Sequence, residues 1–244
     1  MTENRQGTNL VRMKRVHLVD SNGQRDLAMV RRASIAIASY FCNGDQGWVV
    51  GDPIFEYVTE GRQSSHNKLY AQGKVKFPYF SCGDLVHTVL VFLGVRDEHL
   101  INRNMDGGVH PWEPQQNILR PQQHKSWHVF DSRSVYEGGS WFDVGDPFMT
   151  CCDPHVAIFE DIDFNKGELT SYDYGQVSAK GQAQGIRKHR TVHMEGNRLM
   201  IGNKHVVGYV SLADVDLETS AIVPDDFNEG VEDTTNPEPY ILMP

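Results

Sequence analysis

Hydrophobic residues along this chain change their spacing about halfway, from the pattern of helices to the pattern of strands. Residues 25–42 carry apolar side chains on one helical face, and residues 85–95 (LVHTVLVFLGV) are apolar on nearly every side. The first pattern predicts an amphipathic helix, and the second predicts a helix that is buried. Shorter helices are predicted at 52–59, where aspartate and proline open the segment, and at 97–102.

Short runs of β-branched and aromatic residues occupy the last third of the chain, and such runs favour strands. The predicted strands cover residues 148–152, 155–161, 168–174, 190–193, 198–201 and 205–212. The segments EGN at 195–197 and GN at 202–203 predict hairpin turns. Helices followed by a series of strands are typical of an α+β fold.

The ends of the chain differ in composition from its middle. Residues 1–19 are expected to form an N-terminal arm, residues 20–214 one folded domain, and residues 215–244 an acidic, proline-containing tail. This division predicts that the chemistry of the protein lies between residues 20 and 214.

An irregular segment interrupts the folded domain at about residues 103–140. It is rich in Asn, Gly, Pro and Gln, and we interpret it as an insertion, since long irregular segments in compact domains are usually functional or disordered. Trp112 and Trp127 lie within it. We expect their rings either to grip a substrate beside the active groove or to fasten the segment to the body.

Charge and hydropathy exclude several classes of partner. The 244 residues carry a formal net charge of −9, which argues against a broad nucleic-acid-binding face built from clustered Lys and Arg. No apolar stretch is long enough to span a bilayer, so no transmembrane segment is expected. The first residues, MTENRQGTNLVRMKR, contain no apolar core, and we therefore expect synthesis in the cytosol without a secretory signal.

Cys82 lies where an aromatic segment, residues 79–84 (YFSCGD), passes into the buried helix. Unpaired backbone N–H groups and the positive end of the helix dipole stabilise a thiolate at that position. Because the thiolate is the reactive form of cysteine, Cys82 is the candidate nucleophile. The four cysteines are too irregularly spaced for a disulfide framework, and Cys42 is expected to be a small buried side chain.

His155 and Asp173 are the candidate partners of this cysteine. His155 begins the predicted strand HVAIFE directly after a proline, and it is the candidate base. Ser171 and Asp173 share one face of the next strand, because strand side chains alternate. Asp173 is the preferred third residue, since a carboxylate holds the imidazole in one tautomer and stabilises the imidazolium, with Gln176 as its substitute.

The order of these features resembles the NlpC-type branch of papain-like cysteine peptidases. In that family a cysteine begins the central helix, a Gly-Asp turn (here residues 145–146) leads into the sheet, and a His-Val-(small)-Ile strand carries the base. The resemblance covers roughly residues 70–176 and implies a papain-like fold that works without a cofactor. It also implies that Tyr70, twelve residues before Cys82, helps to form the oxyanion site. The chain departs from the family at the nucleophile, where the family has Asp-Cys-Ser-Gly and this chain has Ser-Cys-Gly-Asp at 81–84.

The function that this resemblance implies is cysteine-dependent amide hydrolysis. The implied substrates are the stem or cross-link peptides of peptidoglycan, cut by a phage lysin, a virion-borne hydrolase or a secreted antibacterial effector. Such an enzyme acts at the cell wall or in the periplasm after delivery or lysis. Two alternatives remain open: a transacylase or deamidase that uses the same residues, and a non-catalytic structural or binding module of a phage or secretion particle.

Histidine pairs raise the alternative of a metal site. His124 and His128, like His189 and His193, have the spacing that places two zinc ligands on one face of a helix. The first pair lies in a Pro/Gln-rich region and the second in a predicted strand, and neither has the glutamate of the zinc-protease motif. No Cys-x-x-Cys is present, so the sequence predicts no metal site.

Overall fold

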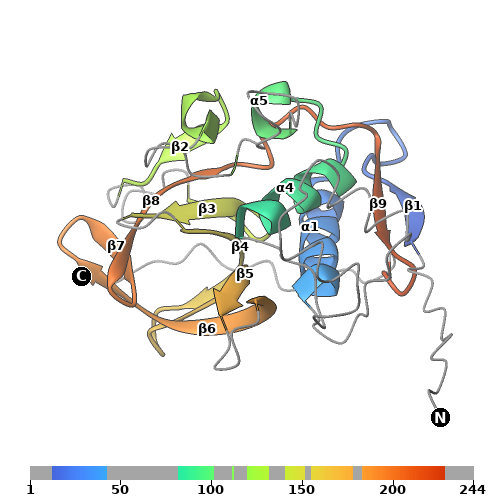
Figure 1. Cartoon of the computed structure of the whole chain (residues 1–244). Helices are drawn as coiled ribbons and strands as arrows, with labels where there is room; N and C mark the ends of the chain where they lie inside the picture. The colour runs from blue at the N-terminus through green and yellow to red at the C-terminus, as the bar shows by residue number, and fades with distance from the viewer. Residues whose placement is uncertain are drawn as a thin grey trace, which may run out of the picture.

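The computed structural model describes residues 13–42, 82–101, 112, 120–131, 141–151, 155–177 and 183–228. The helical elements are α1 (Leu27–Cys42), α4 (Cys82–Phe92), α5 (Glu98–Ile101) and the 3-10 turn η1 (Arg120–Gln123). The strands are β1 (Met13–His17), β2 (Trp127–Val129), β3 (Pro147–Thr150), β4 (His155–Asp163), β5 (Glu168–Val177), β6 (Ala183–Glu195), β7 (Arg198–Ile201), β8 (Lys204–Val210) and β9 (Ser220–Pro224). The α+β class predicted from the sequence is confirmed (Figure 1).

An antiparallel sheet that closes on itself forms the larger part of the structure. Its strand order is β2-β8-β3-β4-β5-β6-β7, and β7 also pairs with β8, so the strands from β3 to β8 form a barrel. Aromatic and aliphatic side chains such as Phe148, Phe159, Leu169 and Val192 fill its interior. Closure pairs the strand edges that an open sheet would expose.

The helices α1 and α4 pack together against one outer face of the barrel, with β9 and β1 beyond them (Figure 1). The side chains of β4 alternate between the outer face of the barrel, which packs on the helices, and its interior. Val156 and Ile158 join the core shared with the helices, whereas Ala157 and Phe159 join the barrel interior. The helix-facing core is the larger of the two, and α4 is buried in it along most of its length, as its all-apolar sequence predicts.

A glycine fixes the end of α4. Gly94 adopts a φ of 78°, its N–H donates to the Val91 carbonyl, and the Val95 N–H donates to the Leu90 carbonyl. These are the two hydrogen bonds of a Schellman motif, which terminates a helix through a left-handed residue. The C-terminal end of α4 is therefore held in place, and this fixes the position of Cys82 at its beginning.

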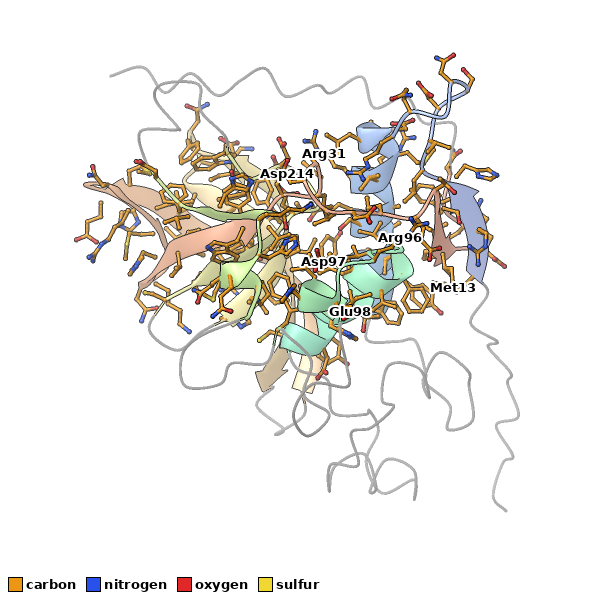
Figure 2. All side chains as sticks on the ribbon, turned by 90° about the horizontal axis from the view of Figure 1, so that it is seen from above. Met13, Arg31, Arg96, Asp97, Glu98 and Asp214 are labelled. Carbon is orange, nitrogen blue, oxygen red and sulfur yellow. The ribbon has the colours of Figure 1, made fainter. Side chains whose placement is uncertain are left out.

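The two ends of the described chain pair with each other. β1 runs antiparallel to β9, with Val16 opposite Ala221, and Met13 marks β1 at the outer side of the molecule (Figure 2). Val16 and Val223 are buried in the core around α1. The compact part therefore extends beyond residues 20–214 at both ends, into segments that the sequence assigned to an arm and a tail.

Most predicted elements agree with the structure to within a few residues. The helices expected at 25–42 and 97–102 correspond to α1 and α5, and the hairpin turns at 195–197 and 202–203 are present with Gly196 and Gly202 at positive φ. The strand expected at 190–193 is part of the longer β6. The helix expected at 52–59 lies outside the described residues.

Candidate active site

Cys82 is the first residue of α4 and is only partly buried, while the residues that follow it are packed into the core. The backbone N–H groups of Gly83 and Val156 are hydrogen-bonded to its sulfur. Gly83 belongs to the first turn of the same helix, and Val156 is the second residue of β4. The helix start and the neighbouring strand thus both supply donors to one sulfur atom.

The structure brings Cys82 and His155 together. The thiol is hydrogen-bonded to the imidazole of His155, the first residue of β4. Burial raises the pKa of the Cys82 thiol, but the hydrogen bond and charge of His155, with the N–H groups of Val156 and Gly83, lower it, and the net direction is downward. A lowered thiol pKa is what a cysteine nucleophile requires, because it increases the thiolate fraction at neutral pH.

Asp173 lies on the other side of the imidazole. Its Oδ2 is 3.2 Å from His155 Nε2, and its side chain has no exposed surface. The Ser171 hydroxyl donates to Asp173 Oδ1 at 3.1 Å, so the two residues share a face of β5, as the strand pattern predicts. Nε2 thus faces both the Asp173 carboxylate and the Arg190 guanidinium, and Nδ1 is the ring nitrogen left for the thiol.

These polar groups lie at one end of the barrel interior. Ser171 and Asp173 have the same orientation along β5 as Leu169, which packs inside the barrel. His155, at the beginning of β4, has the same orientation as the interior residue Phe159. Cys82 therefore meets the imidazole where α4 begins and the barrel ends.

Arg190 on β6 is a fourth member of this cluster, which the sequence interpretation did not include. Its Nη2 is in ion-pair contact with Asp173 Oδ2 and lies 3.2 Å from His155 Nε2. Arg190 is paired with Leu169 across the ladder and shares the orientation of Val192, so it points into the barrel. The sequence alone gives no sufficient signal for it, because alternation turns Arg190 inward only once Val192 is known to face the barrel interior.

The structure does not describe the side chains of two further predicted site residues. Tyr70 lies outside the described residues. Gln176 has its backbone in β5 opposite Gln184, beyond an irregularity in the ladder that follows Asp173, and its side chain lies outside the described part.

Both tryptophans of the insertion fasten the chain to the body. Trp112 has no exposed surface, and its Nε1 donates to the Leu100 carbonyl at 3.0 Å. Trp127 packs against the helix-facing core, with its ring over Gly208. The idea that Trp112 grips a substrate is wrong for this structure, because a ring with no exposed surface reaches no ligand.

The histidines at 124 and 128 form separate pairs. His124 bridges Asp97, at the start of α5 (Figure 2), and the hydroxyl of Ser126, while His128 contacts Asp214. The Ser126–His124–Asp97 array has the composition of a serine triad, but Ser126 is fully buried and is not accessible to a substrate. Within the described residues, no group of three or more His, Cys, Asp or Glu side chains is arranged to hold a metal ion.

The other described cysteines are less suited to act as nucleophiles. Cys42 is buried, as predicted, and its thiol donates to the Asp173 carbonyl at 3.4 Å. Cys151 is disulfide-bonded, a feature that its spacing did not predict.

The Gly-Asp turn at 145–146 has a structural role, and it lies opposite Phe159, four residues along β4 from His155. Asp146 is fully buried, with Oδ1 accepting from the Leu212 N–H and Oδ2 accepting from the Asp143 N–H. Burial raises the pKa of Asp146 to about 8, against the lowering effect of these two hydrogen bonds. The carboxyl joins the turn before β3 to the segment after β8.

Comparisons with protein-family models, curated proteins and solved structures give no match. Within the described residues, no helix is long and apolar enough to cross a bilayer. The arrangement of Cys82, His155, Asp173 and Arg190 is therefore the basis for assigning a function.

Proposed function

We propose that this protein is a cysteine-dependent amide hydrolase with Cys82 as nucleophile, His155 as general base and acid, and Asp173 as the residue that orients the imidazole. The observation that carries the proposal is the hydrogen bond between Cys82 and His155 at the beginning of α4. A nucleophile and a base in hydrogen-bonding reach, with the base held by a third group, are the signature of covalent catalysis.

The proposed reaction has two halves. The Cys82 thiolate attacks the amide carbon, forming a C–S bond, and the Cys82 backbone N–H stabilises the negative oxygen. His155 then donates a proton to the leaving amine as the C–N bond breaks. In the second half His155 takes a proton from water, which attacks the acyl-enzyme and releases a carboxylic acid and the thiol.

The proposed substrates are a narrower class than amides in general. The order of cysteine helix, Gly-Asp turn and histidine strand supports peptide stems or cross-links of peptidoglycan, through the NlpC-type resemblance. The same resemblance makes Tyr70 a second contributor to the oxyanion site. A papain-like arrangement is consistent with a cysteine-bearing helix packed on an antiparallel barrel.

The test is incubation of the purified full chain with sacculi, followed by mass spectrometry of the soluble products. Hydrolysis adds one water across the cleaved amide, transfer to an amine acceptor adds the mass of that acceptor, and deamidation replaces an amide nitrogen by oxygen. Cys82→Ala and His155→Ala should each abolish the products, whereas Cys42→Ala removes a buried thiol that donates to a backbone carbonyl, that of Asp173, and should retain them.

Two results would refute the enzyme assignment. The first is an identical product profile from Cys82→Ala and the unchanged chain. The second is a Cys82 thiol that reacts with iodoacetamide at neutral pH no faster than a cysteine in an unfolded peptide. The second result would favour the non-catalytic binding module.

A further inference from the structure

Arg190 shares one carboxylate oxygen with His155. Its Nη2 contacts Asp173 Oδ2, the same atom that lies 3.2 Å from His155 Nε2. This oxygen makes ion-pair contacts without an aligned hydrogen bond, while Ser171 occupies the other oxygen. The guanidinium nitrogen and the carboxylate oxygen thus lie side by side, both 3.2 Å from the same ring nitrogen of His155.

The guanidinium also brings its charge close to the nucleophile, because Nη2 lies 3.2 Å from Nε2 of the imidazole that contacts the Cys82 thiol. The interaction between Arg190 and the charged form of Cys82 is attractive, and it raises the pKa of the guanidinium against the lowering caused by burial. By reciprocity the same interaction favours the thiolate. Among the described residues, the charged or titratable groups of this site are His155 from β4, Asp173 from β5 and Arg190 from β6, and Asp84 lies in the first turn of α4 that Cys82 begins.

A permanent cation differs from a histidine in its dependence on pH. The imidazolium stabilises a thiolate only while the ring is protonated, whereas a guanidinium stays charged throughout the range in which enzymes work. In a site with both groups, the thiolate keeps a positive partner after the imidazole has lost its proton.

We propose that Arg190 is a positioning residue of this site: a fixed cation that anchors Asp173 behind His155 and stabilises the Cys82 thiolate whether or not His155 is protonated. The inference deepens the proposed function, because it assigns a role within the same site. It concerns thiol ionisation, however, and so it can be tested without a substrate.

The experiment measures the rate of Cys82 alkylation by iodoacetamide as a function of pH, with peptide mapping to separate Cys82 from the other cysteines. Arg190→Gln should move the midpoint of the profile upward by about one pH unit, the lower end of the effect of a neighbouring opposite charge. Arg190→Lys keeps the charge and should move it by less than half as much. Arg198→Gln removes the same charge from an exposed side chain at the start of β7 and should leave the profile unchanged.

Asp173→Asn provides a second parent chain in which Arg190→Gln can be tested if the single variant does not fold. If Arg190→Gln does not fold, because Asp173 is left buried without its cation, the comparison is made between Asp173→Asn and Asp173→Asn/Arg190→Gln. The double variant should again have the higher midpoint by about one unit. A folded Arg190→Gln or double variant whose midpoint equals that of its parent overturns the inference. Absence of hydrolysis with the expected shift would instead refute only the hydrolase proposal.

His155→Ala separates the effect of the Arg190 guanidinium on the thiolate from that of the His155 imidazolium. Its alkylation midpoint should rise, because the imidazole is gone, and it should rise further in His155→Ala/Arg190→Gln. If Arg190 acted only through His155, the second substitution would have no effect on the midpoint once the imidazole is absent. That result would also overturn the inference.

Discussion

Asp173→Asn should destabilise the fold as well as impair the site. The substitution keeps the shape of the side chain and an acceptor for Ser171, but it leaves Arg190 charged inside the barrel without its anion. Removing one partner of a buried ion pair costs about 3–5 kcal/mol, because the other charge remains desolvated. The Arg190 side chain is 14% exposed, so part of its hydration persists, and we expect a cost of about 3 kcal/mol.

Equilibrium unfolding in urea measures this cost, with Asp173→Asn, Arg190→Gln and the double variant compared with the unchanged chain. The double variant contains a neutral pair of similar volume and should recover most of the lost stability. The sum of the two single losses in unfolding free energy should therefore exceed the loss in the double variant by at least about 2 kcal/mol. This difference is a large coupling energy for two residues in contact. A single cost of about 3 kcal/mol is a large part of a total stability of about 5–15 kcal/mol, so the single variants should unfold at clearly lower urea concentrations than the unchanged chain.

Two outcomes would refute this reasoning. If each single substitution cost less than about 1 kcal/mol, the contact would have the strength of a surface ion pair. If the costs were additive, Arg190 and Asp173 would be stabilised by separate surroundings rather than by each other.

Four further predictions follow from the described contacts. Cys82→Ala and His155→Ala should each abolish hydrolysis in the sacculus assay, with melting temperatures close to that of the parent, since residues that act as one unit lose most of their effect singly. Gly94→Ala should cost about 1–2 kcal/mol in urea unfolding, because it places a Cβ at positive φ and within 3.0 Å of packed atoms. Trp112→Ala should cost about 3–5 kcal/mol in the same assay, through the cavity left in the core. Asp146 should make the free energy of unfolding fall as pH rises from about 4 to about 8, by up to ~1.4 kcal/mol per unit, because the folded state keeps a proton that the unfolded state releases.

Matched variants separate these effects from general damage. Gly23→Ala has a similar φ but no atom within 4 Å of the new Cβ, so it should cost less than Gly94→Ala. Asp146→Asn should flatten the pH dependence of stability, whereas Asp225→Asn, at an exposed position, should not. A stability that rises between pH 4 and 8 and is insensitive to Asp146→Asn would contradict the buried neutral carboxyl. A Trp112→Ala variant with unchanged stability but weaker substrate binding would restore the substrate-gripping interpretation.

Local periodicity was sufficient to predict most secondary structure, because helices and half-buried strands repeat at 3.6 and 2 residues. The alternation of Val156 and Phe159 between two cores is of this kind. The pairing of β1 with β9 could not be read in the same way. It joins Met13 to Pro224, and nothing in either short segment specifies its distant partner. Closure of the barrel by β7 and β8 depends likewise on the curvature of the whole sheet.

The residues of the candidate site likewise differ in how far the local sequence predicts them. Cys82 and His155 each have a local signal, a helix start and a strand start, and Asp173 follows from strand alternation once His155 is chosen. Arg190 has no such signal by itself, since an arginine at the edge of an apolar run usually marks a solvent-facing position. Its role depends on β6 bringing it alongside β5 with its side chain turned inward.

Because Arg190 points inward, the Cys82 thiolate does not depend on His155 alone for a positive partner in the proposed site. In a site with cysteine, histidine and carboxylate alone, the imidazolium is the main positive partner of the thiolate, and loss of its proton removes that partner. Here the contact of Arg190 with Asp173 places a second positive charge behind the imidazole. In the proposed reaction the histidine then carries protons in both halves, while the proposed charge of Arg190 that favours the thiolate stays constant. The Arg190 variants test this division of roles directly. At low pH the protonated imidazole supplies a positive partner for the thiolate with or without Arg190. The two cases differ only in how thiol reactivity depends on pH once the imidazole has lost its proton.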